Sequence, residues 1–164
     1  LITNIEWDHF DYFDSEDSYV EVFQKLIDQS QYSILNTDYP LSEKLSNIDQ
    51  TYSADQASHI KLNITGDHNR TNALGVQHIC SKLGISNQDF KRAILQFTHS
   101  ARRMEIISQT DDGILYTDYG HHPTEVKVTL QALREKHPNS KICLIFQPHQ
   151  YNRTLQTIDL FKEA

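Results

Sequence analysis

The sequence predicts an α/β protein built from two pieces that follow one another. Segments with apolar residues at alternate positions, such as Ile60, Leu62 and Ile64, take turns with segments whose apolar residues recur every three or four positions. The rhythm changes near residues 98–102, where we expect a domain boundary. The 164 residues are 38% hydrophobic and 10% aromatic, which is enough for a packed core.

The first piece is expected to run strand, helix, short strand, irregular segment, strand and two helices. Its opening strand lies near residues 1–5, and a helix should follow Ser15, because apolar residues recur there at helical spacing and two acids occupy the first turn. Residues 36–58 are mostly polar and indicate a loop-rich connection. Alternation then predicts a strand at residues 60–64.

Two helices should close the first piece. One runs from about Arg70 to Gly84, where the glycine is typical of a helix end. The other has apolar residues on one face as far as Phe97, and Ser86 and Asp89 are spaced like a capping pair at its start.

The second piece is expected to begin with a strand from Arg103, a turn and a second strand at residues 113–117. A helix at about residues 123–136, a strand at 141–147 and a final helix should follow. Pro123 suits the first helical position. A strand, helix and strand in succession almost always form a right-handed parallel unit, so the loops after both strands should share the sheet edge where α/β proteins bind ligands. We therefore expect one crevice, with exposed helix N–H groups favouring anions. Its side chains would be Asp118, His121, His122, His149, Gln150 and Arg153. The alternative is that these are solvated turn residues, with a histidine merely capping a helix.

Two loops of the first piece carry further candidates. In GDHNRTNALG, residues 66–75, the Asn amides offer the donors and acceptors that a purine edge requires, although Asn69 or Thr71 could simply be an N-cap. In TNIEWDHFDYF, residues 3–13, carboxylates beside His9 suggest a divalent cation, although acidic loops are common.

Composition excludes several classes of function. A net charge of −7 argues against a broad nucleic-acid surface, while a small anion could still be held by a few Arg residues. Cys80 and Cys143 match no metal spacing and are expected to be buried free thiols, as in a reducing cytoplasm. The longest aliphatic run, residues 142–146, is too short to cross a bilayer, so we expect a soluble protein.

In combination and in this order, the loops resemble the Mur ligases of bacterial cell-wall synthesis. The motifs that carry the resemblance are TNIEWDHFDYF, GDHNRTNAL, ARRMEI, TDYGHHPTEV and FQPHQYNRT. It is strongest at residues 101–154 and poorest at 33–58, where this sequence is shorter than the family pattern. The resemblance implies that residues 1–100 are the latter part of the central ATPase domain. Residues 101–164 would be the first part of a Rossmann-like C-terminal domain that binds the amino acid.

The resemblance also implies a cytoplasmic reaction with ATP and Mg²⁺. ATP would phosphorylate the carboxylate of UDP-N-acetylmuramate, and the amine of L-alanine would attack the acyl phosphate to form an amide. Arg103 would face the phosphates and act with His122 in catalysis. The resemblance implies that adenine is contacted by His68, Asn69 and Asn72, and the ribose by Asp118. His121 and His122 would lie near the nucleotide, and His9 would bind the metal. The carboxylate of the amino acid would be bound by His149, Gln150 and Arg153.

This sequence departs from the family pattern at several positions. None of the five glycines opens a G-x-x-x-x-G-K-[ST] phosphate loop, so we expect a piece of a longer enzyme that is inactive alone. Trp7 stands where the family has Pro or Phe, and Gln150 where it has Arg. A tripeptide-recycling branch of the same superfamily also carries a double-histidine loop, with Phe-Ala in place of Tyr119 and Gly120 and a small residue in place of Glu125, so it ranks second. Two other readings stay open: a non-catalytic nucleotide-binding module, and a metal-dependent hydrolase, for which no H-E-x-x-H spacing exists.

Overall fold

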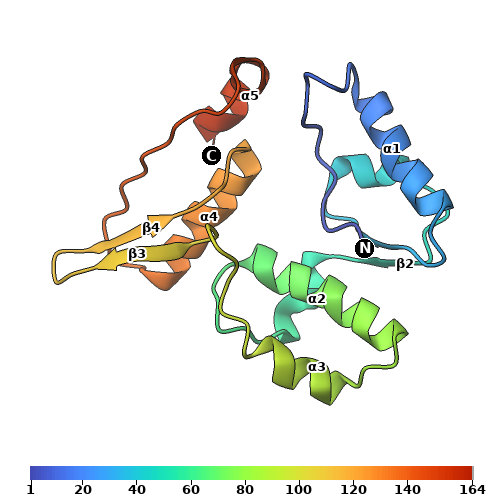
Figure 1. Ribbon diagram of the computed structural model, residues 1–164, viewed down its shortest axis with the longest axis horizontal. Helices are drawn as coiled ribbons and strands as arrows, with labels where there is room; N and C mark the ends of the chain where they lie inside the picture. Colours follow the sequence, from blue (N-terminus) through green and yellow to red (C-terminus); the bar gives the residue numbers. More distant parts are fainter. Residues whose placement is uncertain (164) are drawn as a thin grey trace. The chain divides into compact units, whose positions relative to one another are not determined.

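The computed structural model describes every residue except Ala164 and the side chain of Asn152, and it divides into two compact units. The first unit comprises Leu1–Leu62 and Asp67–Leu95, and the second comprises Asn63–Gly66 and Gln96–Ala164. Both units mix helices and strands, which confirms the α/β class (Figure 1). The change of unit at Leu95 lies close to the boundary expected near residues 98–102.

In the first unit, helix α1 (Glu16–Asp28) begins where the sequence predicts. The Ser15 side chain accepts a hydrogen bond from the backbone N–H of Ser18, and the Ser18 side chain caps Ser15 in return. Val20 and Ile27 are buried on the inner face of the helix. Local signals alone therefore account for the position of this helix.

The small sheet of the first unit is parallel. β1 (Ile34–Asn36) pairs with β2 (Gln50–Tyr52), and the expected opening strand is reduced to a single bridge between Ile2 and Leu35. The prediction of a loop-rich segment at residues 36–58 was wrong in part. This segment holds β2 and two 3-10 helices, η1 (Pro40–Lys44) and η2 (Ala54–His59).

The strand predicted at residues 60–64 was also wrong, because these residues pair with no strand in the described structure. Ile60 instead ends η2 and is buried in a core cluster. Alternating apolar residues can be buried by side-chain packing alone, whereas a strand also needs a neighbour for its backbone hydrogen bonds. The members of this cluster are Ile34, Tyr52, Ala57, Ile60, Ala73, Leu74 and Phe90.

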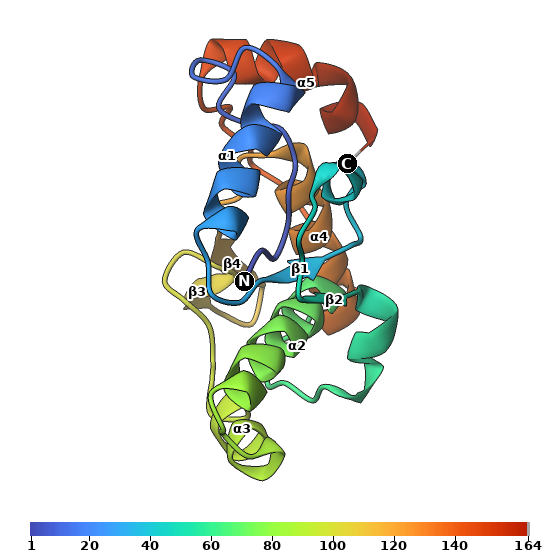
Figure 2. The same cartoon turned by 90° about the vertical axis from the view of Figure 1, so that its right-hand side faces the viewer.

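Helix α2 (Asp67–Lys82) starts three residues before the expected position, so Asn69 and Thr71 lie inside the helix and neither is its N-cap. Gly84 follows the helix with φ +80, a conformation that glycine adopts at little cost. Helix α3 (Asn87–Ile94) has Ser86 as N-cap, and its side chain accepts from the backbone N–H of Asp89, as predicted. α2 and α3 contact each other (Figure 2).

The second unit contains an antiparallel hairpin and two helices. β3 (Glu105–Gln109) pairs with β4 (Ile114–Thr117), with an irregularity between Ile106 and Ser108. Helix α4 (Pro123–Lys136) has the predicted bounds, with His122 as N-cap. Helix α5 (Tyr151–Glu163) contacts α4.

The strand predicted at residues 141–147 was wrong, and with it the parallel strand–helix–strand unit. Among the described residues, β3 and β4 pair only with each other, and residues 141–150 form no strand. The side chain of Ile145 is 91% exposed, and Cys143 is exposed, contrary to the expectation of a buried thiol, while Cys80 is partly buried. An extended apolar segment becomes a strand only when a neighbouring backbone supplies its partners. Within the described residues, no helix is long and apolar enough to cross a bilayer.

Candidate functional site

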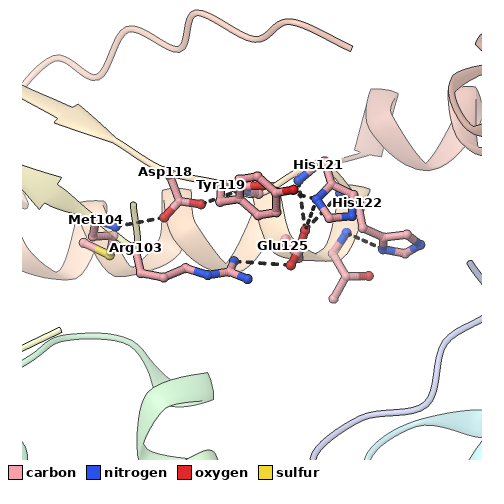
Figure 3. Close-up of polar contacts among 9 residues, drawn as sticks. Arg103, Met104, Asp118, Tyr119, His121, His122 and Glu125 are labelled. Atoms are coloured by element: carbon pink, nitrogen blue, oxygen red, sulfur yellow. Dashed lines mark hydrogen bonds and ion pairs between the residues drawn. The ribbon is translucent and has the colours of Figure 1, made fainter. Parts of the chain in front are cut away.

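The best-defined candidate site surrounds the N-terminus of α4, in the second unit (Figure 3). Asp118, directly after β4, accepts the backbone N–H of Met104 at 2.9 Å on one carboxylate oxygen and that of Gly120 at 2.7 Å on the other. One carboxylate thus connects the chain before β3 to the loop after β4. Each oxygen of a carboxylate has capacity for a further hydrogen bond, so this role does not use up Asp118.

Gly120 is needed here because of close approach. A Cβ atom at this position would lie 2.9 Å from Oδ1 of Asp118 and 3.3 Å from Cβ of Glu125. A side chain would push the Asp118 carboxylate away from the backbone N–H groups that it accepts.

His122 is the N-cap of α4 and is buried. Its Nδ1 accepts the backbone N–H of Thr124 at 3.3 Å, so in this neutral form the ring proton is on Nε2. The capping role that we considered as the alternative for a histidine is therefore present. It leaves Nε2–H as the donor with which His122 could meet a ligand.

Glu125 connects the members of this site, and sequence reasoning missed it. One oxygen accepts the backbone N–H groups of His121 at 2.9 Å and His122 at 3.2 Å, and the other accepts Nη1 of Arg103 at 3.3 Å. Nδ1 of His121 lies 3.4 Å from the same carboxylate and forms an ion pair with it when the ring is protonated. The available signal was a Glu three residues after a capping residue, which is typical of a capping box.

The charge of Glu125 is stabilised where it lies. Burial opposes ionisation, but the two backbone N–H groups and the charges of His121 and Arg103 hold the pKa of Glu125 below its ordinary value of 4.5. Because its pKa is lower in the folded state, the ionised Glu125 side chain contributes to the stability of the fold. This contribution is complete above about pH 4.5 and is lost as the pH falls through the folded-state pKa. Glu125 is thus an anion at neutral pH.

The N–H groups at the start of α4 already donate hydrogen bonds to side chains of the same segment. The expectation that they would favour an external anion was therefore wrong at this helix. Those of His121 and His122 donate to Glu125, and that of Thr124 donates to His122. The carboxylate of Glu125 takes the place that a phosphate occupies at other helix N-termini.

The guanidinium of Arg103, which pairs with Glu125, lies near an aromatic ring together with the guanidinium of Arg102. The guanidinium carbons of Arg102 and Arg103 lie 4.6 Å and 5.9 Å from the ring centre of Tyr119, which is half exposed. Arg102 and Met104 have φ of 59 and 47, a left-handed conformation that is uncommon outside glycine. The N–H of Arg102 donates to Glu105 at 2.7 Å, and that of Met104 donates to Asp118. The turn that presents the arginines is thus tied at two points.

The other second-unit candidates lie at the start of α5. His149 and Gln150 are exposed, whereas Arg153 is 4% exposed. Gln150 has φ 72, and its carbonyl accepts the N–H and the hydroxyl of Thr154 at 3.2 and 3.0 Å. These residues do not share a sheet edge with Asp118, because the strand that would have placed them there does not form.

In the first unit, His68, Asn69 and Asn72 lie on the first two turns of α2. The spacing of three and four residues places His68 and Asn69 next to Asn72 on the helix surface. All three side chains are at least partly exposed.

His9 does not by itself make a metal site. Its side chain is 60% exposed, and its Nε2 lies 3.9 Å from a carboxylate oxygen of Asp8. No group of three His, Cys, Asp or Glu side chains that could hold a metal gathers within the described residues. Mg²⁺ at phosphate sites usually keeps several waters and takes only one or two protein ligands beside the substrate phosphates, so the metal role of His9 stays a prediction. Nearby, Trp7 packs against the core cluster of Ile5, Val20 and Leu41.

Comparison with known proteins shows what this chain is similar to. The pattern of the family described as "Mur ligase, glutamate ligase domain" matches residues 102–163. UDP-N-acetylmuramate–L-alanine ligase of Caldicellulosiruptor bescii is 32% identical over 198 residues, covering 100% of this chain and 43% of that protein. The enzyme of the same name from Aquifex aeolicus is 26% identical, covering 98% and 43%. This chain thus spans less than half the length of these relatives.

Solved structures agree on the fold. The crystal structure of UDP-N-acetylmuramate-alanine ligase MurC from Thermotoga maritima superposes with a TM-score of 0.74 at 24% identity, covering 95% of this chain and 42% of that one. MurF from Acinetobacter baumannii superposes with a TM-score of 0.65 at 19% identity, covering 80% and 36%.

Proposed function

The chain belongs to the Mur ligase family, and on that premise we propose that it serves ATP-dependent joining of UDP-N-acetylmuramate to L-alanine in bacterial peptidoglycan synthesis. ATP would convert the muramyl carboxylate into an acyl phosphate, which the amine of L-alanine attacks to form the amide and release phosphate. The relatives that cover the whole chain carry the name of this reaction, which favours it over other reactions of the family. The proposal includes a cytoplasmic location.

The observation that carries the proposal is that Arg103, His121 and His122 donate to the carboxylate of Glu125 while Asp118 accepts the backbone N–H of Met104, within the segment that matches the family. The guanidinium of Arg103 would neutralise charge that develops on the phosphoryl oxygens, the main requirement of phosphoryl transfer. Asp118 would accept a ribose hydroxyl, and the Nε2–H of His122 would donate to the nucleotide. Arg103 and His122 are the catalytic residues of this proposal.

The remaining candidates keep the roles that the family resemblance implies. His68, Asn69 and Asn72 would contact adenine, and His149, Gln150 and Arg153 the carboxylate of L-alanine. His9 would be a ligand of the cation, and we route no step of the reaction through that cation. Mg²⁺ would accompany the phosphates of ATP.

The 164-residue chain alone should show no L-alanine-dependent ATP hydrolysis. It contains no glycine-rich loop followed by Lys, so the backbone cradle for the phosphates is missing. A coupled assay for phosphate release checks this. Turnover in the ordinary range of about 1 to 10³ s⁻¹ would contradict the assignment of these residues to only part of the catalytic machinery.

A chimeric enzyme, called the grafted ligase below, tests the function itself. In it, this chain replaces the matching stretch of the Caldicellulosiruptor bescii ligase, and phosphate release is measured with UDP-N-acetylmuramate and L-alanine. Activity that depends on L-alanine supports the proposal. Activity with a tripeptide in place of L-alanine would favour the recycling branch, and ATP binding without turnover would favour a non-catalytic nucleotide-binding module. Stoichiometric zinc in the purified chain would favour a metal-dependent hydrolase.

Changing Gln150 to Arg in the grafted ligase should lower the KM for L-alanine. Gln150 is exposed at the start of α5, so a longer side chain meets no packed neighbour there. An added guanidinium can bind a carboxylate by charge-assisted hydrogen bonds worth about 1.5 to 3 kcal/mol, or roughly ten- to a hundredfold in affinity. Gln and Arg accept the left-handed backbone at this position about equally, so a change in KM reports on the side chain. An unchanged KM would remove Gln150 from the site.

A further inference from the structure

The N-terminus of α4 is filled by an anion from the same chain. Glu125 accepts two backbone N–H groups from the residues that lead into the helix and one N–H from Arg103 (Figure 3). We infer that Glu125 is the positioning residue of this site: an internal counter-ion that holds Arg103 and both histidines in place and directs a phosphate-bearing ligand to the arginine rather than to the helix N-terminus. The part concerning the ligand rests on the proposed function.

The first step of this inference concerns charge. Backbone N–H groups at a helix N-terminus attract anions, but here a carboxylate already occupies them. A phosphate placed there would face Glu125 and be repelled. The only guanidinium that contacts this carboxylate in the described structure is that of Arg103, which has five N–H donors, of which one is given to Glu125. The remaining N–H donors of Arg103 can bind an external phosphate.

The second step concerns His122. Its ring accepts the N–H of Thr124 only because the backbone around it is extended, with φ −93 and ψ 146. The hydrogen bonds from His121 and His122 to Glu125 hold that backbone. Glu125 therefore acts on the ring through the backbone, keeping Nδ1 as the acceptor and Nε2 as the donor.

Two substitutions in the 164-residue chain separate these effects. Glu125→Gln keeps an oxygen that can accept the two N–H groups but removes the charge that holds Arg103. Glu125→Ala removes both. Glu163→Gln, an exposed position on α5, is the matched control for loss of one negative charge.

Amide hydrogen exchange and side-chain NMR provide the readouts. In Glu125→Ala, exchange at the amides of His121 and His122 should accelerate at least tenfold relative to the amides of α4, while in Glu125→Gln it should stay within about threefold of the unmodified chain. In the unmodified chain and in Glu163→Gln, the Arg103 side-chain signals should move as Glu125 titrates, and in Glu125→Gln they should not. Unchanged exchange in Glu125→Ala, or an Arg103 response that survives in Glu125→Gln, would overturn the inference.

Titration of the grafted ligase with pyrophosphate and then with ATP tests where the anion goes. Shifts at the Arg103 side chain with the amides of His121 and His122 unmoved support the inference, and the reverse pattern overturns it. If neither compound shifts any signal, the proposed function loses its support, while exchange and the pH response still decide the role of Glu125.

Discussion

Changing Arg103 to Ala in the grafted ligase should lower kcat/KM about 10²- to 10³-fold. Removing one preorganised donor to charge that develops in a transition state costs about that factor in other enzymes. Phosphate release at saturating and limiting ATP separates kcat from KM, and an effect on kcat indicates that the guanidinium acts on the transition state. Arg103→Lys should recover part of the activity, because it restores the charge but not the planar set of donors.

The control for Arg103 is Lys127→Ala, which removes one positive charge from an exposed position on α4 and should change kcat/KM less than about twofold. Because Arg103 also pairs with Glu125, its loss leaves a partly buried carboxylate without that cation. The melting temperature must therefore be recorded alongside the rates. Activity within about threefold of the parent, in a folded Arg103→Ala variant, would remove Arg103 from catalysis.

A second large effect is expected in the core of the first unit, at Gly75. In the interior of a helix, Gly to Ala usually stabilises by about 0.5 to 1 kcal/mol. Here a Cβ atom would lie 2.6 Å from the hydroxyl oxygen of Tyr52, 2.8 Å from its Cζ, and 2.9 Å from Cδ1 of Leu1. Tyr52 is 1% exposed and has no room to withdraw, so Gly75→Ala should destabilise the first unit by about 1 to 3 kcal/mol.

Urea unfolding measures this change, and three further variants test its physical cause. The hydroxyl of Tyr52 has no hydrogen-bond partner among the described residues, so Tyr52→Phe should be neutral or stabilising. In the double variant, Tyr52→Phe should recover part of the cost of Gly75→Ala, because the nearest atom is gone while Cζ remains. Gly113→Ala, where nothing lies within 4 Å of the added Cβ, is the control that should leave stability almost unchanged. A stabilising Gly75→Ala would show that the core can move aside.

The starts of α1, α3 and α4 followed from the sequence because their signals are local, whereas α2 begins three residues before the expected position. Ser15, the Ser86–Asp89 pair and Pro123 after His122 each place a helix start through contacts within one turn. The α/β class followed in the same way, from the periods of the apolar residues. The loops that carry the candidate residues were recognisable as motifs, since their residue types stand next to each other in the chain.

Contacts between distant residues were decided only by the tertiary structure. Residues 60–64 and 141–147 have strand-like sequences, yet neither forms a strand here, because strand formation depends on a neighbouring backbone that alternation does not specify. Arg103 meets Glu125 across 22 positions, and Met104 meets Asp118 across 14. The sequence by itself determined which chemical groups are present at the start of α4. Folding decided that Arg103 pairs with the carboxylate that fills that helix N-terminus, because only packing brings the Arg103 turn against it.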